Sequence, residues 1–528
     1  MFALDRNCFS VRGFFFSPDS PAGTADPSAP PVICKDKESL MKILPELNEI
    51  RKIAESGDYN VLPLSCEILS DFTTPIETMR ILKNVDEHCF LLESASIDET
   101  WGRYTFLGFD PKMDITCVDG VMKAGGRQMK TGNPSDVLRQ ILLDYRSPHF
   151  DYLPSFTGGL VGYFSYDYLG YSEPAARCEA EDTEAFKDVD LMLFDKVIAF
   201  DHVRQKIILI VNIDLRHVES SYNKGVLELK NLVHLLRHGA KKEEPAGRLL
   251  GPVTPLFDKE RFCDMVERAK RYIYEGDIFQ IVLSNRLSAP FEGSLLNTYR
   301  VLRTVNPSPY MFYFAGTDVE VAGASPETLV KLENGILHTF PLAGTRPRGK
   351  TQEEDLQLEK DLLQDEKELA EHNMLVDLGR NDLGRISKFG TVQVEKLHSI
   401  ERFSHVMHIG STVRGEIAEG KDALSAIEAV LPAGTLSGAP KIRACQLIAE
   451  LENNKRGIYG GAIGYIDFTG NMDTCIAIRI AYKKNGKVFV RSGAGIVADS
   501  VPEKEFEECL NKAKASLRSL ELAQEVDE

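Results

Sequence analysis

The sequence predicts an α+β fold built on large antiparallel β-sheets, and two observations support this class. First, the strands come as hairpins: Tyr459–Phe468, Thr474–Lys483 and Lys487–Ser492 read as a meander whose last turn holds Asn485-Gly486, a strong hairpin signal. Second, long amphipathic segments such as Lys259–Glu275 stand between groups of strands, not between single strands. This order disfavours a doubly wound parallel sheet.

The first half of the chain divides into an extension, a strand-rich segment and a linker. Ser17–Pro31 is rich in Pro, Ala and Ser and has no hydrophobic period, so we expect residues 1–40 to be a disordered N-terminal extension. A helix is predicted from Met41, and residues 41–237 are predicted to be a first domain. The charged, Gly- and Pro-containing stretch 238–255 is predicted to be a linker. The strands expected in this half are Cys89–Glu93, Tyr104–Phe109, Gly159–Tyr163, and Leu191–Phe200 facing Lys206–Ile213.

The second domain, residues 256–528, combines further strands with two capped helices. Thr351 with Glu354 resembles a capping box and predicts a helix that stops near Gly379. Ser500 with Glu503 predicts another helix start. The expected strands are Gln280–Arg286, Tyr310–Phe314, Glu320–Gly323 and Thr328–Glu333.

Composition excludes several classes of function. The net charge of −17 argues against a nucleic-acid surface. The ten cysteines show neither metal-like spacing nor a small disulfide framework, so we expect reduced thiols and a cytoplasmic protein. No apolar run is long enough to span a membrane, and Phe14–Phe16 is too short for the apolar region of a signal peptide.

Gly344–Thr351 satisfies the phosphate-loop formula G-x-x-x-x-G-K-[ST], and a nucleotide-binding protein is the alternative of a different class. Pro347 removes one backbone donor from the middle of that loop. A strand predicted over Ile336–Ala343 precedes the motif and a helix follows, but the surrounding strands pair as hairpins and do not form a parallel βαβ unit. We therefore interpret the match as fortuitous.

Two pairs of carboxylates lie at helical spacing. Glu368 and Glu371 share a helix face with Leu375 and Leu378, and Glu505 and Glu508 flank an apolar stripe near a helix start. Either pair is compatible with a solvated acidic face. Brought to one cavity, they would suit Mg²⁺, which prefers oxygen ligands and keeps water and substrate in its shell.

Candidate anion-binding groups lie near the C-terminus. Arg479 is predicted on a strand face among small residues, where it would bind a carboxylate or form an internal salt bridge. Gly493-Ala494-Gly495 follows the neighbouring strand and would present N–H groups to an anion or form a tight turn. His408 is compatible with an acid–base role or a structural one, and Glu327 is unremarkable alone.

Several longer motifs together resemble the chorismate-utilising enzymes, over essentially all of residues 256–522. The motifs are Pro341–Gly349, Ala370–Arg385, Leu431–Lys441, Tyr459–Tyr465 and Gly493–Pro502. Within that family, Leu91–Ser94, Gly102–Gly108 and Asn306–Phe312 resemble the large subunits (component I) of anthranilate synthases. The resemblance implies two large, roughly orthogonal antiparallel β-sheets sandwiched by helices. It also implies a regulatory and partner-binding role for residues 41–237 and a chorismate-binding catalytic domain at 256–528.

The resemblance also implies the chemistry. Aminodeoxychorismate synthases of the folate pathway, the alternative within the family, typically have Lys where this chain has Ala343, and isochorismate synthases have a Lys base where it has Gln280. Both lysines are missing, which favours direct attack of ammonia on C2 of chorismate, yielding anthranilate and pyruvate. The implied catalytic residues are Glu327 as general acid, His408 and Thr435. The implied substrate-binding residues are Gly344, Thr345, Tyr459, Arg479, Gly493, Ala494 and Gly495. Mg²⁺ is implied at Glu371 and Glu508, supported by Glu368 and Glu505.

The family's regulation and assembly are implied in the same way. Tryptophan is expected to inhibit through Ser94, Pro309, Tyr310 and Met311. The partner is expected to be a glutamine amidotransferase small subunit (component II), in a heterotetramer of two large and two small subunits. None of the ten cysteines lies in G-x-C-x-G, so the amidotransferase activity is not expected on this chain.

Overall fold

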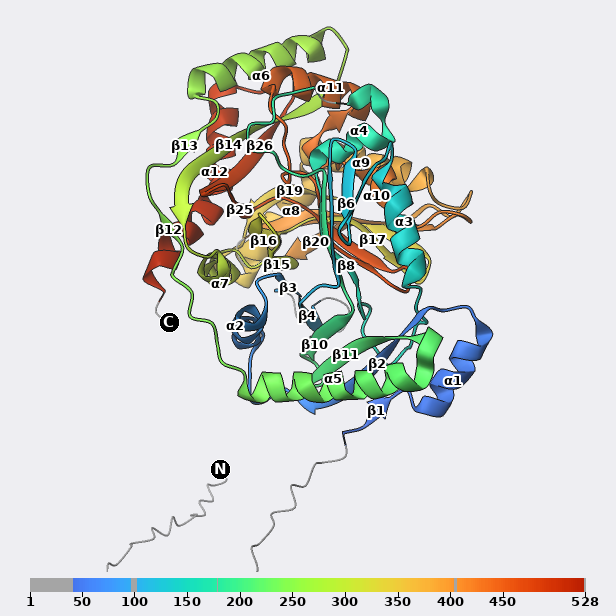
Figure 1. Ribbon diagram of the computed structural model, residues 1–528. Helices are drawn as coiled ribbons and strands as arrows, with labels where there is room; N and C mark the ends of the chain where they lie inside the picture. Colours follow the sequence, from blue (N-terminus) through green and yellow to red (C-terminus); the bar gives the residue numbers. More distant parts are fainter. Residues whose placement is uncertain (1–40, 96–101, 178, 403–405, 527–528) are drawn as a thin grey trace, which may run out of the picture. The chain divides into compact units, whose positions relative to one another are not determined.

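The computed structural model describes residues 41–95, 102–177, 179–402 and 406–526. The predicted disordered extension, 1–40, lies outside the described residues. Two large antiparallel β-sheets form the framework, and each takes strands from both halves of the chain (Figure 1). The predicted α+β class with two large antiparallel sheets is confirmed.

Sheet 1 has fourteen strands among the described residues, and every pairing in it is antiparallel. In spatial order it comprises β1 (Ile43–Leu44), β2 (Val61–Leu69), β11 (Lys206–Asp214), β10 (Lys196–Asp201), β4 (Tyr104–Phe109), β3 (Cys89–Glu93), β15 (Tyr310–Ala315), β16 (Glu320–Ser325), β25 (Ile480–Lys484), β26 (Lys487–Ile496), β14 (Gln280–Glu292) and β12 (Arg248–Leu249). Two further strands, β13 (Thr254–Pro255) and β22 (Gly438–Ala439), also pair with β14.

Sheet 2 has twelve strands in the described part of the chain, again paired antiparallel. Its order is β19 (Leu342–Pro347), β21 (Val406–Glu416), β18 (Ile336–Thr339), β17 (Thr328–Glu333), β24 (Met472–Ile476), β23 (Ala462–Asp467), β8 (Gly159–Phe164), β9 (Val189–Phe194), β5 (Met113–Val118), β6 (Val121–Ala124) and β7 (Arg127–Lys130). The remaining strand, β20 (Gln393–Arg402), pairs with β21.

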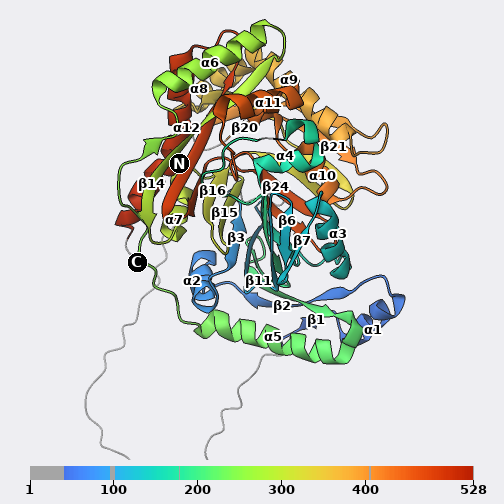
Figure 2. The same cartoon turned by 45° about the horizontal axis from the view of Figure 1, so that its top comes forward.

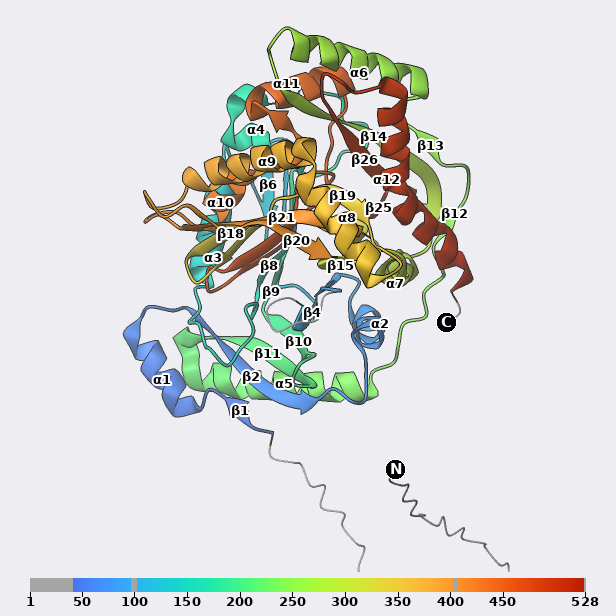
Figure 3. The ribbon, with the colours of Figure 1, turned by 180° about the vertical axis from the view of Figure 1, so that it is seen from behind.

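Helices cover the sheets, and none that the structure describes is long and apolar enough to cross a membrane. Figures 2 and 3 show α6 (Lys259–Tyr274), α11 (Lys441–Glu452) and α12 (Pro502–Leu522) beside β14 and β26, while α8 (Gln352–Gln364) and α9 (Glu366–Gly384) lie by β19 and β21. The remaining α-helices are α1 (Leu47–Ser56), α2 (Pro75–Val85), α3 (Pro134–Asp144), α4 (Leu169–Ser172), α5 (Val218–His238), α7 (Leu296–Val305) and α10 (Ala423–Val430).

One large apolar cluster lies between the two sheets. It joins Phe90 and Phe312 of sheet 1 to Tyr163, Phe194 and Ile463 of sheet 2, all at most 2% exposed. A second cluster packs sheet 2 against α3, α9 and α10, and a third packs β14 and β26 against α6, α11 and α12. Apolar side chains on both faces of the central strands bury the area that stabilises this layered arrangement.

Two predicted strands are wrong because the chain crosses between the sheets in the middle of each. Leu191–Phe200 divides at Asp195 into β9 of sheet 2 and β10 of sheet 1, so only β10 faces β11. Thr474–Lys483 divides in the same way into β24 of sheet 2 and β25 of sheet 1. In each run, buried and mostly apolar segments flank a charged crossing, Asp195-Lys196 in the first run and Arg479 in the second, and neither carries a Gly or Pro there.

The predicted helix boundaries also need correction. The helix expected from Met41 begins only at Leu47, after Pro45, because a proline disfavours the helical conformation of the residue before it. The helix expected to run from Thr351 to Gly379 is two helices. Asp365 caps the second by accepting from the N–H groups of Lys367 and Glu368, and that helix continues past Gly379 to Gly384.

The expected capping box at Ser500 does not form. The Ser500 Oγ accepts from the N–H of Val497, and α12 begins after Val501, which has no capping side chain. The strand expected over Ile336–Ala343 is likewise two strands, β18 and β19.

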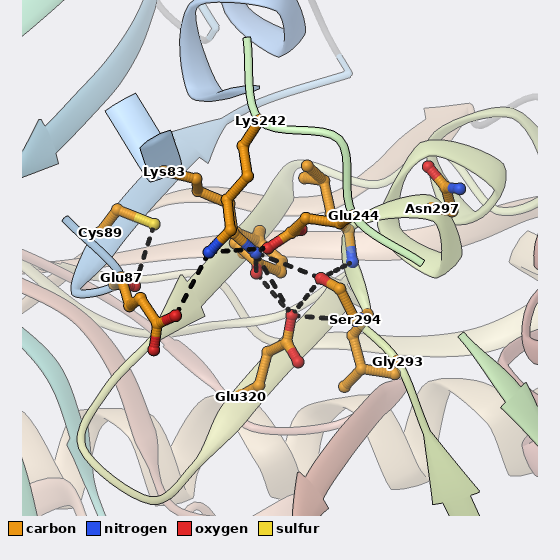
Figure 4. A network of polar contacts seen from close by, with 12 residues as sticks. Lys83, Glu87, Cys89, Lys242, Glu244, Gly293, Ser294, Asn297 and Glu320 are labelled. Atoms are coloured by element: carbon orange, nitrogen blue, oxygen red, sulfur yellow. Dashed lines mark hydrogen bonds and ion pairs between the residues drawn. The ribbon is translucent and has the colours of Figure 1, made fainter. Parts of the chain in front are cut away.

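A buried polar network ties α2 and the segment 238–255 to sheet 1 (Figure 4). The Lys83 Nζ lies 2.7 Å from Glu244 Oε2 and 3.7 Å from Glu320 Oε1, and it is 5% exposed. The Glu320 carboxylate also accepts from Ser294 Oγ and Tyr313 Oη. Burial would raise the pKa of Glu320, but the nearby Lys83 and Lys483 lower it below its usual range. Glu320 therefore stays ionised inside the protein, and it depends on its cations to do so.

Removing one cation from this network should destabilise the fold. We expect Lys83→Met to lower the free energy of unfolding by about 3–5 kcal/mol, because Glu320 would remain buried with less compensating charge. Urea denaturation at pH 7 measures the change. The exposed Lys52→Met is the matched control and should change stability by less than about 0.5 kcal/mol. Equal stability of the two variants would contradict the assigned importance of the network.

Candidate active site

A cavity of about 560 Å³ opens where the two sheets approach α9 and α12. Most of the residues singled out in the sequence line it. They are Glu327, Thr345, Glu371, His408, Thr435, Tyr459, Arg479, Gly493, Gly495, Glu505 and Glu508, with Gln280 and Ala343 beside them. These side chains come from segments up to 228 positions apart, so only the folded chain assembles them.

Of the residues singled out for catalysis, substrate binding or metal binding, three do not line the cavity. Gly344 lies behind Thr345 with its carbonyl 2.9 Å from His408 Nδ1, and Glu368 lies next to Gly344. Ala494 is fully buried, with its side chain in the cluster under α6, α11 and α12. The tryptophan-site residues Ser94, Pro309, Tyr310 and Met311 also lie elsewhere, as described below.

Glu327 is a buried carboxyl in the loop between β16 and β17. Its Oε1 accepts a hydrogen bond from Thr435 Oγ1 at 3.0 Å. Burial raises the pKa of Glu327 to about 7, against the opposing effects of the Thr435 hydroxyl and the Lys512 ammonium. A carboxyl with such a pKa can hold a proton near neutrality and transfer it, as a general acid must.

Thr435 is carried by a short 3₁₀ helix, η4 (Gly434–Leu436), which we call the Thr435 turn. The turn packs closely on α9, because a Cβ on Gly434 would lie 1.7 Å from Leu378 Cδ2. The glycine therefore allows the turn to approach the helix that also carries Glu371.

His408, on β21, lines the cavity beside Thr345 of the neighbouring strand β19. Its ring Nδ1 lies 3.1 Å from Thr345 Oγ1 and 2.9 Å from the Gly344 carbonyl. Burial lowers the pKa of His408, against the opposing effect of the Gly344 carbonyl, so the ring is neutral at pH 7 and Nδ1 donates to that carbonyl. Gly344 forms a bulge in β19 with φ of 65°, a conformation that favours glycine and that aims its carbonyl at the histidine.

The phosphate-loop motif has a different structure. Its first four residues, Gly344–Pro347, belong to β19, which pairs antiparallel with β21. Arg346 and Arg348 form ion pairs with Asp365 and Asp355 of the following helices, and Thr351 caps α8. The backbone therefore takes part in a sheet and does not form a loop around a phosphate.

Arg479 lies at the crossing from β24 to β25, not on the strand face that the sequence predicts. Its φ is 55°, which is uncommon for a residue with a side chain. The Arg479 Nη1 donates to the Lys512 carbonyl at 3.2 Å, and burial lowers the pKa of the guanidinium. The break between β24 and β25 therefore directs the Arg479 guanidinium toward the cavity.

The acidic residues come from two helices. Burial raises the pKa of Glu371 on α9, and repulsion from Glu368 and Glu508 adds to the effect. Burial and the neighbouring Glu508 also raise the pKa of Glu505 on α12. In the described part of the chain, no three His, Cys, Asp or Glu side chains converge closely enough to hold a metal ion alone. The carboxylates therefore provide a partial ligand set of oxygens and an excess of negative charge.

Sequence reasoning missed Lys512, which lies one turn after Glu508 on α12. Its Nζ donates to Glu508 Oε1 at 2.6 Å and to the Gly493 carbonyl at 3.1 Å. The Gly493 carbonyl that Lys512 binds points away from β14. Since the N–H and C=O of a strand residue point to the same side, the N–H groups of Gly493 and of Gly495, two positions on, point away from β14 as well. The only available signal was the i,i+4 spacing to Glu508.

The expected tryptophan-site residues lie together on neighbouring strands outside the cavity. β3 pairs with β15 so that Glu93 is opposite Met311, and the N–H of Ala95 donates to the Ser308 carbonyl. Tyr310 Oη donates to Asp473 Oδ1 at 2.8 Å. The Leu91–Ser94 and Pro309–Met311 segments are thus adjacent in space.

A family model described as chorismate binding enzyme matches residues 87–518. The chain is 46% identical over 502 residues to "Anthranilate synthase component 1" of Acetivibrio thermocellus, covering 91% of this chain and 99% of that protein. It is 44% identical over 498 residues to the protein of that name from Pseudomonas aeruginosa, covering 90% and 99%.

Two solved structures are also similar. Anthranilate synthase component I from Streptococcus pneumoniae TIGR4 matches with a TM-score of 0.71 and 39% identity, covering 85% of this chain and 98% of that one. MenF, the menaquinone-specific isochorismate synthase from Escherichia coli, matches with a TM-score of 0.65 and 20% identity, covering 90% and 98%. The second likeness concerns the fold alone.

Replacing Glu327 should stabilise the fold at alkaline pH. The folded-state pKa of Glu327 is raised, so the native state binds the proton more tightly than the unfolded state between about pH 4.5 and 7. Its contribution to stability is therefore lost as pH rises through that window. We expect Glu327→Gln to unfold at a higher temperature than wild type at pH 8.5 and to lose this advantage near pH 4.5.

Differential scanning calorimetry at both pH values measures the effect. Exposed Glu419→Gln is the matched control and should show no such pH-dependent gain. A stability difference between Glu327→Gln and wild type that does not vary with pH would contradict the raised pKa.

Proposed function

The chain belongs to the family of chorismate-binding enzymes, and we propose that it converts chorismate and ammonia to anthranilate and pyruvate as the large subunit of an anthranilate synthase. This reaction is the first step of tryptophan biosynthesis. The observation that supports it best is the cavity itself, where the protonatable Glu327 and the cationic Arg479 face acidic side chains from α9 and α12.

Chorismate carries two carboxylates, and the cavity offers a separate partner for each. We assign the enolpyruvyl carboxylate to Arg479, Tyr459 and the N–H groups of Gly493 and Gly495, which point away from β14. The ring carboxylate would lie toward Glu371 and Glu508. Two carboxylates repel each other, so a cation is needed between these glutamates and the substrate.

Mg²⁺ fits this donor set. Glu371 and Glu508 would hold it, with Glu368 and Glu505 in support, because carboxylates are hard oxygen ligands. Burial and neighbouring carboxylates raise the pKa of Glu371 and Glu505, so added positive charge would be favourable there. Their incomplete set leaves positions for water and substrate. When bound, the ion would neutralise the ring carboxylate of chorismate.

The protein's own residues then account for the proton movements. Glu327 donates its proton to the departing C4 hydroxyl while ammonia attacks C2, so the ring double bonds shift and water leaves. Loss of the C2 proton and of pyruvate follows, driven by aromatisation. His408 and Thr435 orient the ring carboxylate and assist this second step. The neutral His408, held through Nδ1 by the Gly344 carbonyl, is in the protonation state that can accept a proton.

Two cavity residues favour this reaction over those of other family members. Ala343 and Gln280 both line the cavity. By the family resemblance, aminodeoxychorismate synthases carry a lysine at the position of Ala343, and isochorismate synthases carry one at the position of Gln280. Neither offers an amine nucleophile or a base. Ammonia is therefore the nucleophile that we propose for C2.

The ammonia would come from glutamine through a separate amidotransferase subunit, in a heterotetramer of two large and two small subunits. All seven described cysteines are unpaired, and burial raises the pKa of each thiol, to about 12 for Cys66, Cys89 and Cys509. Such thiols are poor nucleophiles for glutamine hydrolysis. Reduced cysteines also agree with a cytoplasmic site of action, and the first domain, 41–237, is the proposed docking region.

The purified chain should form anthranilate and pyruvate from chorismate, Mg²⁺ and ammonium. Anthranilate fluorescence and a coupled pyruvate assay measure both products, and EDTA should abolish them. Glutamine should replace ammonium only after the amidotransferase subunit is added. Accumulation of aminodeoxychorismate or isochorismate in place of anthranilate would assign the chain to another branch of the family.

Tryptophan should inhibit through the adjacent Leu91–Ser94 and Pro309–Met311 segments, away from the chemistry. We expect Ser94→Phe to raise the tryptophan concentration for half-inhibition by about tenfold or more, since coupling of this kind is worth about 1–3 kcal/mol. The turnover number with ammonium should stay within about twofold of wild type. Parallel loss of turnover and inhibition would instead mean that the segment belongs to the catalytic site or the core.

A further inference from the structure

A fully buried ion triad lies under the floor of the cavity. The Glu452 carboxylate at the end of α11 binds two guanidinium groups: Arg456 Nη2 lies 2.6 Å from Glu452 Oε1, and Arg491 Nη2 lies 2.7 Å from Glu452 Oε2. The three side chains are at most 1% exposed. Burial alone would raise the pKa of Glu452, but the two arginines hold it below its usual range. We call this group the Glu452 triad.

The two arginines of the triad have different hydrogen-bond partners besides Glu452. Arg491 itself lines the cavity, and its Nε donates to Ser284 Oγ at 2.9 Å and its Nη1 to Asn454 Oδ1 at 2.9 Å. Arg456 instead binds the carbonyls of two residues that line the cavity. Its Nη1 donates to the Leu436 carbonyl at 2.6 Å and its Nη2 to the Val282 carbonyl at 2.7 Å.

The Leu436 carbonyl belongs to the Thr435 turn. The turn carries the hydroxyl that donates to Glu327, and it is a short 3₁₀ segment with no capping side chain of its own. Val282 belongs to β14 and lines the same cavity. A single guanidinium therefore joins the Thr435 turn to β14 of sheet 1, while Glu452 neutralises its charge.

The shape of the side chain matters here. Arginine presents its donors in a rigid planar fork, so it can reach one carboxylate and two carbonyls at once, whereas lysine is a point charge on a flexible stem. The Arg456 guanidinium also lies 4.6 Å from the centroid of the Tyr166 ring, which fixes its plane.

We propose that Arg456 is a positioning residue for the proposed reaction, one that holds the Thr435 turn so that the Thr435 hydroxyl stays hydrogen-bonded to Glu327. The inference rests on the proposed function, and no group of Arg456 touches the substrate. Its effect reaches the chemistry through one hydrogen bond, from Thr435 Oγ1 to Glu327 Oε1.

Arg456→Lys tests this because it keeps the charge beside Glu452 but cannot keep both carbonyl contacts. The Thr435 hydroxyl stabilises the carboxylate form of Glu327, so losing it raises the pKa of the acid. We expect the alkaline limb of the kcat–pH profile to move upward by roughly one pH unit, with kcat about tenfold lower and KM for chorismate within about twofold. Ammonium is adjusted at each pH to keep the concentration of free NH₃ constant.

Two companion variants separate positioning from general damage. Arg491→Lys is the matched control, because Arg491 is as deeply buried, binds the same Glu452 and even lines the cavity, but does not donate to the Thr435 turn. Its alkaline limb should stay where wild type has it. Thr435→Val should reproduce the shift seen in Arg456→Lys, and the double variant should shift no further. Lys512, Arg479 and His408, and the carboxylates of Glu371, Glu505 and Glu508, also line the cavity and are unchanged in all of these proteins. Arg491→Lys keeps the positive charge at the lining position that it alters.

Crystal structures of the variants give a readout that does not depend on turnover. The distance from Thr435 Oγ1 to Glu327 Oε1 should exceed 3.5 Å in Arg456→Lys and stay near 3.0 Å in Arg491→Lys. If Arg456→Lys fails to fold, Glu452→Gln, which loosens the guanidinium and keeps its shape, should show the same displacement and a smaller pH shift.

The outcomes are distinct. A wild-type protein that makes no anthranilate overturns the proposed function, and the crystallographic distances then still decide whether Arg456 holds the turn. An unmoved Thr435 turn in Arg456→Lys, or an alkaline limb that moves equally in Arg491→Lys, overturns the positioning role.

Discussion

The site depends on one constraint, which is that the chain crosses from one sheet to the other at two adjacent places. β16 of sheet 1 leads through Glu327 into β17 of sheet 2, and β24 of sheet 2 leads through Arg479 into β25 of sheet 1. The crossings bind each other: the N–H of Ile476 donates to the Glu327 carbonyl at 3.0 Å and the N–H of Ala324 to the Arg479 carbonyl at 3.2 Å. The left-handed backbone at Arg479 is unfavourable alone, and it persists because these strands are fixed on both sides.

Electrostatics explains why the cavity needs such a rigid frame. Burial raises the pKa of Glu327 and lowers that of Arg479, so each group is held where its charged form is disfavoured. The Glu452 triad and the Lys83 network, by contrast, are buried charges with close partners. In the cavity itself, Glu508 is paired with Lys512, whereas burial dominates the pKa of Glu327. The apolar layer between the sheets supplies the stabilisation that tolerates this arrangement.

The sequence was most informative where local patterns decide the structure. The strands at Cys89–Glu93 and Thr328–Glu333 have the predicted bounds, because polar and turn-forming residues delimit each short segment. Prediction from the sequence failed at Asp195 and Arg479, where strand-like segments lie on both sides of a charged residue and only tertiary contacts show that the sheet changes there. Helical spacing placed Glu371 and Glu508 on their helices, but nothing local predicts that α9 and α12 face one cavity. Lys512 and the Glu452 triad were missed because an i,i+4 spacing alone does not show that Lys512 reaches the Gly493 carbonyl or that Arg491 joins Glu452 from 39 positions away.

The hairpin of β15 and β16 gives a physical route between the proposed tryptophan segment and the proposed general acid. Tyr310 lies opposite Ser325 in the hairpin, two positions before Glu327. Its hydroxyl is 3.0 Å from Thr328 Oγ1, on the residue that follows Glu327. A ligand that displaces Tyr310 therefore acts on both sides of Glu327 at once. Because packed strands have discrete arrangements, a shift of β15 would move Ser325 and Thr328, the neighbours that position Glu327. The route proposed for inhibition therefore needs only this hairpin and the first residue of β17.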